Sequence, residues 1–260
     1  MSFETLEVTL DARGVAQVAL NRPDKRNALS ARMIEDLTEV ATTLGQGGAR
    51  VIVLSGRGKV FCAGGDLGWM QAQIAADRAT RMAAARKLAE MLRALNEMPV
   101  PLIGRLHSAA FGGGVGLACV CDVAVAEAGT QFGLTETRLG LIPATIAPYV
   151  IARIGEGMAR RVFMSARVFS ATEAERLGLV ARVVPEAELD AAIEAEIEPY
   201  LMAAPAAVGR AKALARALGP QIDATVIEDT IRRLADTWET DEAAEGIAAF
   251  LAKRAPVWTT

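Results

Sequence analysis

The sequence predicts an α/β fold, with a mostly parallel sheet followed by a helical C-terminal region. Residues 3–10 and 14–20 alternate apolar and polar side chains around a glycine-containing turn, which predicts a β-hairpin. A helical pattern follows Ser30, and the continuous apolar run 50–55 is typical of a buried parallel strand. Strand, helix and strand in succession form a crossover unit, which favours parallel pairing. From Glu186 onward the pattern is helical alone.

Each further element has its own signal. Ser30 can cap the first helix, in which apolar residues recur at helical spacing as far as Leu44. Pro99 and Pro101 end a second helix that carries Met82 to Leu95. The further strands that we expect span residues 101–106, 122–127 and 179–184. A mixed loop spans 130–143, and further helices are expected over 143–154, 170–178, 186–202, 205–218, 222–238 and 240–253.

The change to helices alone predicts two regions of the chain. A core is expected over residues 1–195 and a helical region over residues 196–260. The alanine and leucine faces of the helical region need a partner, which is either the protein's own core or another subunit. The sequence contains no internal repeat and no low-complexity linker.

Composition excludes several classes of partner. With 28 basic and 31 acidic residues, the chain has no general attraction for nucleic acid or an anionic membrane. No uninterrupted apolar stretch reaches the roughly 20 residues of a membrane helix, and the N-terminus lacks a signal-peptide pattern, so we expect a cytoplasmic protein. Three cysteines in apolar contexts indicate a reducing compartment. Cys119-x-Cys121 and the single histidine, His107, make a poor zinc site, so no metal is expected.

Two glycine-bearing turns carry the first functional signal. Gly112, Gly113 and Gly114 precede a run of small residues that predicts a helix, and a second turn lies in Phe61–Leu67. Turns at helix N-termini present backbone N–H groups that can hold a developing negative charge, and glycine lets a ligand approach the backbone closely. A single such run is more often a tight turn, but the pair together points to an anion-stabilising site.

The motifs occur in a fixed order along nearly the whole chain. They are Asn21-Arg-Pro23 with Asn27-Ala-Leu29, Phe61–Leu67, Ala109–Gly114, Cys121-Asp122, Phe132–Glu136 and Gly246–Arg254. In this order they resemble the crotonase (enoyl-CoA hydratase/isomerase) family. The resemblance implies a spiral of ββα units, acyl-CoA substrates, and assembly as a homotrimer or dimer of trimers. Thr135–Pro148 and Phe111–Gly116 look most like bacterial methylglutaconyl-CoA and carboxygeranoyl-CoA hydratases.

The resemblance also assigns roles to individual residues. It implies that the N–H groups of Ala63 and Gly113 hold the thioester oxygen, where each donor can lower the barrier by about 3–4 kcal/mol. Asp66 is expected to order the first turn. The remaining substrate contacts that the resemblance implies in this region are Ala28, Gly64, Gly65, Leu67, Gly112 and Gly116.

Glu136 is the candidate for proton transfer. It matches the second catalytic glutamate of the family, and an apolar pocket would raise its pKa toward the working pH. The position of the first catalytic glutamate is Gly116, and residues 109–121 contain no acid. One carboxylate would therefore do the work of two. This departure leaves hydration and double-bond isomerisation both open.

Basic residues are candidates for the charged parts of the substrate. Arg138, and with less support Arg105, would hold a distal carboxylate, and alternation along an extended segment would place Arg138 on the side of Glu136. An ion pair within the protein or between subunits is an equally good explanation for Arg138. By resemblance, Phe250 and Lys253 reach the adenine pocket of a neighbouring subunit. The residues expected to meet the CoA phosphates are Lys25, Arg26 and Lys59.

The sequence therefore predicts a hydratase-like lyase that adds water to a branched or carboxylated α,β-unsaturated acyl-CoA. The first alternative is a Δ3–Δ2 enoyl-CoA isomerase, for which one glutamate suffices. The second is a non-catalytic or RNA-binding member of the family, against which the acidic composition argues. No cofactor is expected, since CoA enters as part of the substrate.

Overall fold

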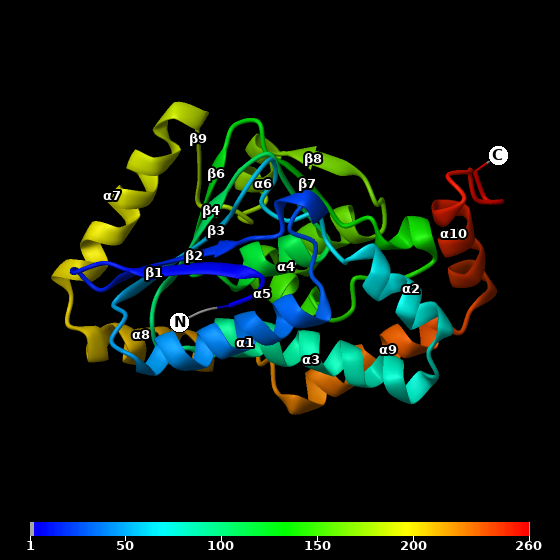
Figure 1. Ribbon diagram of the computed structural model, residues 1–260, viewed down its shortest axis with the longest axis horizontal. Helices are drawn as coiled ribbons and strands as arrows, with labels where there is room; N and C mark the ends of the chain where they lie inside the picture. The colour runs from blue at the N-terminus through cyan, green and yellow to red at the C-terminus, as the bar shows by residue number, and fades with distance from the viewer. Residues whose placement is uncertain (1–2, 260) are drawn as a thin grey trace.

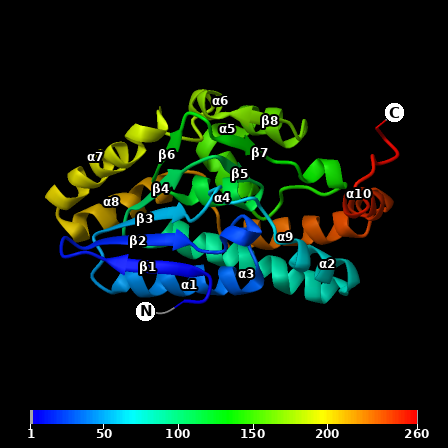
Figure 2. The same cartoon turned by 45° about the horizontal axis from the view of Figure 1, so that its top comes forward.

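The computed structural model describes residues 3–259, which fold around two sheets. The larger sheet has the order β1-β2-β3-β4-β6-β9 (Figures 1 and 2). Only β1 runs antiparallel to its neighbour, and the other pairs are parallel. The strands are β1 (Leu6–Leu10), β2 (Val15–Leu20), β3 (Val51–Gly56), β4 (Leu102–Leu106), β6 (Val123–Glu127) and β9 (Arg182–Val184). The predicted hairpin and parallel crossover are confirmed.

Both faces of this sheet are covered by helices. Ile52 and Leu54 of β3 pack in one apolar cluster with α1 (Ala31–Gln46) and α3 (Arg78–Glu97). Val51 and Val53, on the opposite face, pack against α7 (Leu189–Met202). Because successive side chains of a strand alternate between faces, a strand buried on both sides reads as the continuous apolar run seen in the sequence.

A second, smaller sheet positions the chemistry. It consists of β5 (Ala109–Phe111), β7 (Gln131–Gly133) and β8 (Val168–Ser170) in that order. β5 and β7 are parallel, whereas β7 and β8 are antiparallel. Phe132 and Phe169 stack across β7 and β8 with ring centroids 5.8 Å apart. These strands were not predicted from the sequence, because three residues are too few to show a period.

The remaining helices follow the predicted order closely. α9 (Ala224–Trp238) packs on α3 through a cluster of small and branched residues, Ala85, Ala89, Ile227 and Ile231. α10 lies at the end of the molecule opposite α7 (Figure 1). The α-helices not yet given are α2 (Leu67–Ala75), α4 (Gly113–Val120), α5 (Ala147–Phe163), α6 (Ala171–Arg176), α8 (Pro205–Leu218) and α10 (Asp241–Leu251). The short 3-10 helices are η1 (Pro23–Lys25), η2 (Glu136–Leu139) and η3 (Glu186–Glu188).

Two predicted boundaries differ from the structure. The helix expected over residues 143–154 is α5, which starts at Ala147 and continues to Phe163. Pro148, rather than Pro143, lies in its first turn, and Gly155 with φ 75° kinks it. The division proposed after residue 195 lies within α7, which packs on the sheet.

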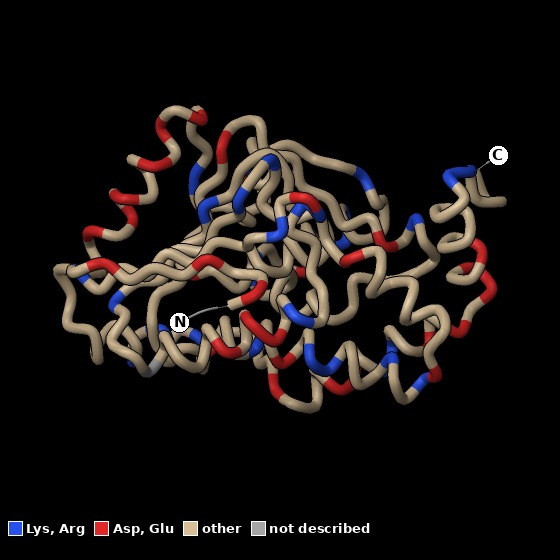
Figure 3. Tube along the Cα trace, viewed as in Figure 1, with Lys and Arg blue, Asp and Glu red and all other residues tan. Residues whose placement is uncertain are grey.

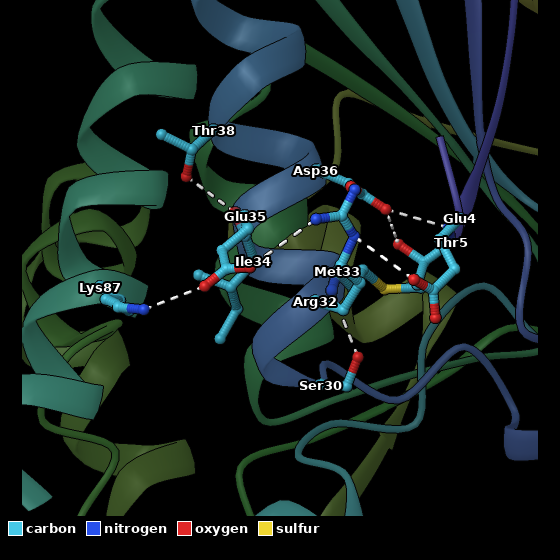
Figure 4. A network of polar contacts seen from close by, with 10 residues as sticks. All are labelled: Glu4, Thr5, Ser30, Arg32, Met33, Ile34, Glu35, Asp36, Thr38 and Lys87. Atoms are coloured by element: carbon cyan, nitrogen blue, oxygen red, sulfur yellow. Dashed lines mark hydrogen bonds and ion pairs between the residues drawn. The ribbon is translucent and has the colours of Figure 1, made fainter. Parts of the chain in front are cut away.

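A buried carboxylate fixes the start of β1 to α1. Asp36 is fully buried, and its Oδ2 accepts hydrogen bonds from the amide and hydroxyl of Thr5 at 3.0 and 2.7 Å (Figure 4). The guanidinium of Arg32 lies 2.9 Å from the other oxygen. Buried charges are tolerated when they are paired and hydrogen-bonded in this way. The N-terminal strand is thereby held against the first crossover helix.

Charge is distributed unevenly over the surface. Acidic residues follow one another along α7, and α10 also carries acidic residues alone (Figure 3). Among residues 3–259, no helix is both long and apolar enough to cross a membrane.

Candidate active site

Three segments that are distant in sequence end side by side. Cys62 forms a parallel bridge with Ala110 of β5, and β5 in turn pairs in parallel with β7. The chain that leaves each of these segments carries Gly64, Gly112 or Glu136. A Cβ on Gly112 would lie 3.9 Å from the Cα of Gly64 and 3.0 Å from Oε1 of Glu136. Parallel pairing thus brings both glycine turns and the candidate acid to one edge.

Gly112 has a conformation that only glycine adopts readily. Its φ of 47° and ψ of −113° allow the turn that begins α4. A Cβ here would also lie 3.0 Å from Oε1 of Glu136, a tight contact that would require the carboxylate to shift. The glycine therefore permits both the turn and the close approach of the acid.

Two backbone N–H groups in the turns are free to bind an anion. Within residues 3–259, neither the Gly65 nor the Gly113 amide has a hydrogen-bond acceptor. In the bridge between Leu29 and Gly65, the bonds run from Leu29 N to Gly64 O and from Asp66 N to Leu29 O. In a parallel bridge of this register the central residue's own amide points away from the partner. The Gly65 amide is thus directed away from Leu29.

The structure contradicts the prediction for Ala63. Its N–H donates to the carbonyl of Arg26 at 3.0 Å, so this amide is already occupied. The donor on this turn is Gly65, two residues later. The motif alone did not reveal this, because Gly64, with φ 96°, turns the backbone between Ala63 and Gly65 and the sequence does not say which amide is paired.

A polar loop holds the first turn in place. Asn27 is fully buried, and its Nδ2 donates to the carbonyls of Arg57 and Val60 at 2.8 and 2.9 Å. Its Oδ1 accepts from the amide of Arg22 at 2.9 Å. This side chain therefore joins residues 22–28 to residues 57–60. In the sequence, Asn27 stands out only as part of the motif Asn27-Ala-Leu29.

Asp66 orders the turn, as expected. Its Oδ1 accepts from the amide of Trp69 at 3.1 Å and caps α2, while Oδ2 pairs with Arg22 at 3.0 Å. Burial by itself would raise the pKa of Asp66, but the Trp69 amide and the Arg22 guanidinium outweigh it and lower the pKa. Asp66 is therefore an ionised structural group.

Glu136 has the properties of an acid–base group. It begins η2, and its Oε2 is closed off from solvent with no hydrogen-bond partner in residues 3–259. Burial raises the pKa of Glu136 to about 7, against a smaller opposing effect of its own backbone N–H. A carboxyl that titrates near neutral pH can both accept and return a proton.

Gly116 is not a substrate contact, which corrects that prediction. It is buried within α4, and a Cβ there would lie 2.5 Å from Cγ2 of Ile146. Ile146, itself 3% exposed, closes the space beside Gly116. The position at which the resemblance implies a further glutamate is thus filled by an apolar side chain.

The structure removes the alternation argument for Arg138 and pairs Arg105 within the protein. Residues 136–139 form a 3-10 helix, so Glu136 and Arg138 do not share the face that alternation along a strand would give. Arg138 is exposed and has no ion-pair partner within residues 3–259. Arg105 pairs with Asp190 of α7 at 2.7 Å, on the other side of the sheet.

The candidate phosphate ligands lie in two adjoining loops. Lys25, Arg26 and Lys59 are all exposed, and none of them forms an ion pair in the part of the chain described here. A Cβ on Gly58 would lie 2.6 Å from Cβ of Pro23, which shows how closely the loops approach. Since Arg26 O binds the Ala63 amide, these cations border the first glycine turn.

The other predicted contacts lie beside the first glycine turn or at the end of α10. Ala28 is 8% exposed, and its carbonyl accepts from Arg22 at 2.8 Å. Leu67, the first residue of α2, is 54% exposed. Phe250 is 48% exposed near the end of α10, and Lys253 follows it. Whether they reach another subunit stays a prediction.

A cavity of about 550 Å³ lies at the opposite, C-terminal end of α4. Its charged lining residues are bound within the protein: Arg153 donates to the carbonyl of Cys119, and Arg216 pairs with Glu97 at 2.9 Å. The free amides of Gly65 and Gly113 and the carboxyl of Glu136, whose pKa is raised, lie at the other end of the helix. We place the chemistry there.

Comparison with known proteins decides the family. The enoyl-CoA hydratase/isomerase family model matches residues 11–260. The chain belongs to this family. Members of the family act on acyl-CoA substrates, so this protein is an enzyme of the hydratase/isomerase type.

Solved structures agree over the whole chain. An enoyl-CoA hydratase from Shewanella pealeana is 36% identical with a TM-score of 0.81, over 99% of this chain and 97% of its own. An enoyl-CoA hydratase from Mycobacterium avium is 30% identical with a TM-score of 0.86, over 99% and 100%. Pseudomonas aeruginosa AtuE is 39% identical with a TM-score of 0.80, over 99% and 100%. The crotonase-like fold with its helical C-terminal region is therefore confirmed.

Proposed function

We propose that this enzyme adds water across the double bond of a branched or carboxylated α,β-unsaturated acyl-CoA. The observation that carries the proposal is the position of Glu136, whose Oε1 lies 3.0 Å from where a Cβ of Gly112 would be and whose Oε2 is buried without a partner. An acid with a pKa near 7 thus borders a turn with free amides.

The two amides would stabilise the anion formed during the reaction. The thioester oxygen lies between the N–H groups of Gly65 and Gly113, the latter at the N-terminus of α4. Attack on the β-carbon gives an enolate, whose charge the amides and the helix dipole meet. Each amide lowers the barrier by about 3–4 kcal/mol. No metal or prosthetic group is needed for this step.

One carboxyl can complete the addition. Ionised Glu136 accepts a proton from water as the hydroxyl oxygen bonds to the β-carbon, and the electron pair of the double bond moves to the thioester as an enolate. Glu136 then returns the proton to the α-carbon, so that water is added in full and the carboxylate is regenerated. A pKa near the working pH serves both transfers.

The substrate's charged groups have candidate partners. Lys25, Arg26 and Lys59 would bind the CoA phosphates, since ammonium and guanidinium groups are the usual phosphate ligands. Arg138 stays our candidate for a distal carboxylate because its guanidinium is exposed and unpaired within residues 3–259. Replacement of Arg138 by Met should then weaken turnover of carboxylated substrates alone; equal loss on all acyl-CoAs would contradict this role.

Assembly as a homotrimer or dimer of trimers is also proposed. Leu214 and Leu218 of α8 are 61% and 81% exposed, which supports burial of that helix in another subunit. Phe250 and Lys253 would lie near a neighbouring active site. We place the protein in the cytoplasm, because its three cysteines are free thiols.

The alternative activity is Δ3–Δ2 isomerisation, which the closed position beside Gly116 favours. A single carboxylate can move a proton from one carbon to another without activating water. An RNA-binding role finds less support, given the excess of acidic residues.

The deciding experiment follows the ultraviolet absorbance of the enoyl thioester with 3-methylglutaconyl-CoA, crotonyl-CoA and a 3-enoyl-CoA. We expect loss of absorbance with the carboxylated substrate, abolished by Glu136→Gln. A gain of absorbance with the 3-enoyl-CoA, with no hydration of the others, would assign the isomerase. No reaction with any of the three would contradict both activities.

A further inference from the structure

The C-terminal helix meets the turn that carries Glu136 by direct backbone contact. A Cβ on Gly246 of α10 would lie 2.5 Å from the carbonyl carbon and 2.7 Å from the carbonyl oxygen of Leu139. Reciprocally, a Cβ on Gly140 would lie 2.5 Å from the amide nitrogen of Ala243. Real Cβ atoms do not come this close, so both contacts require glycine.

Apolar packing completes this contact. Leu141, Ala243 and Ile247 form a small buried cluster of their own, with exposed fractions of 8%, 0% and 4%. Leu141 also donates its amide to the carbonyl of Glu136 at 3.1 Å, which closes the 3-10 turn. The helix thus packs on both the turn and the residue that locks it.

The N-terminal end of α10, which includes Ala243, is anchored at a distance from the sheet. Its N-cap Thr240 accepts from the amide of Ala243 at 3.2 Å. The preceding helix α9 is tied to α3, where Arg78 binds Asp236 and Glu239 at 2.6 and 2.7 Å. Three connected helices, α3, α9 and α10, therefore hold the contact with η2, and we call them the helical frame.

The carboxyl of Glu136 depends on the helical frame. Its Oε2 has no hydrogen-bond partner within residues 3–259, and Oε1 faces Gly112, which has no side chain to hold it. The position of the acid is set by the backbone of η2. Displacements of about 1 Å at a catalytic group can cost a hundredfold in rate.

We propose that α10 is a positioning element for Glu136, and that Gly246 is the positioning residue that sets the distance between α10 and η2. This role rests on the proposed function of Glu136. Gly246 itself touches no reacting atom. It acts by allowing α10 to lie against Leu139, which keeps the acid beside the oxyanion turn.

The experiment compares Gly246→Ala with Gly157→Ala in the full chain. Both glycines lie inside helices, but a Cβ on Gly157 meets nothing within 4 Å. For Gly246→Ala we expect a fall in kcat of about tenfold or more with little change in KM. The acidic limb of its pH profile should also move to lower pH, since displacement would expose the carboxyl. Gly157→Ala should behave as the unaltered enzyme.

A second variant guards against misfolding. Ile247→Ala removes packing instead of adding a clash, so it loosens α10 while leaving Gly246 in place. We expect the same direction in kcat and in the pH profile, with far-ultraviolet circular dichroism confirming that both variants are folded. An unchanged kcat and pH profile in folded Gly246→Ala or Ile247→Ala would overturn the positioning role.

Glu136→Gln separates this inference from the proposed function. If Glu136→Gln is inactive while Gly246→Ala is fully active, the positioning role of α10 is refuted and the proposed role of Glu136 stands. Active Glu136→Gln refutes the proposed role of Glu136 and, with it, the positioning role of α10.

Discussion

Gly116 of α4 faces Ile146, whose Cγ2 lies 2.5 Å from the place that a Cβ on residue 116 would take. The side chain of Ile146 thus occupies the space that a side chain at residue 116 would need. A carboxylate at residue 116 would be buried against Ile146, where an unpaired charge is costly. Replacing the glycine by glutamate is therefore not a simple route to a two-carboxylate site.

We predict that Gly116→Ala destabilises the protein by about 1–3 kcal/mol, as overpacking of a close-packed core does. Gly157→Ala should instead be neutral or stabilising by up to about 1 kcal/mol, because alanine favours the helix. Urea denaturation measures both. Combining Gly116→Ala with Ile146→Ala should give a smaller loss than the sum of the single changes. Strict additivity would contradict the assigned contact.

The second prediction concerns the Gly65 amide. Gly65→Pro deletes the N–H, whereas Gly65→Ala keeps it, and a Cβ here would meet only Cγ of Met70, at 3.9 Å. We expect kcat to fall about 10²–10³-fold further in the proline variant than in the alanine variant. Measurement of kcat for both variants tests this. Comparable activity of the two would remove Gly65 from the oxyanion hole.

The third prediction is the pH dependence of hydration. Glu136 must be ionised to accept a proton from water, and burial raises its pKa to about 7. We therefore expect kcat/KM, which reports the free enzyme, to fall about tenfold per pH unit below that value. Glu136→Gln should lose about 10²–10⁴-fold in kcat, and its pH profile should lack the acidic limb, the fall in activity below pH 7. A limb that persists in the variant would identify a different titrating group.

Much of the large sheet and its helices could be predicted from the sequence. The run Val51–Leu54 is apolar at every position, and Ser30 caps α1 through the amide of Met33 as its position implied. These signals are local, so they need no knowledge of the rest of the chain. The C-terminal helices were predicted equally well, because prolines and glycines separate them.

The site was harder to predict because its geometry depends on pairing. The three-residue strands β5 and β7 have no readable period, yet their parallel register places Glu136 beside Gly112. Which amide faces outward, Ala63 or Gly65, is decided by the bridge to Leu29. Ile146 had no signal at all, since its contact with Gly116 joins residues that only the folded chain brings together.

The last prediction links Glu136 to stability. Its pKa is raised from the ordinary value of 4.5 to about 7, mainly by burial. Between these values the native state binds more protons than the unfolded state, so the free energy of unfolding falls as pH rises. The loss approaches about 3 kcal/mol above pH 7.

Glu136→Gln cannot ionise, so its stability relative to the unaltered protein should grow from pH 4.5 to pH 8. Urea denaturation across this range measures the difference, with Glu156→Gln, an exposed carboxylate of α5, as the matched control. Parallel stability curves for Glu136→Gln and the unaltered protein would show that the carboxyl is solvated, and the argument for a single neutral-range acid would fail with it.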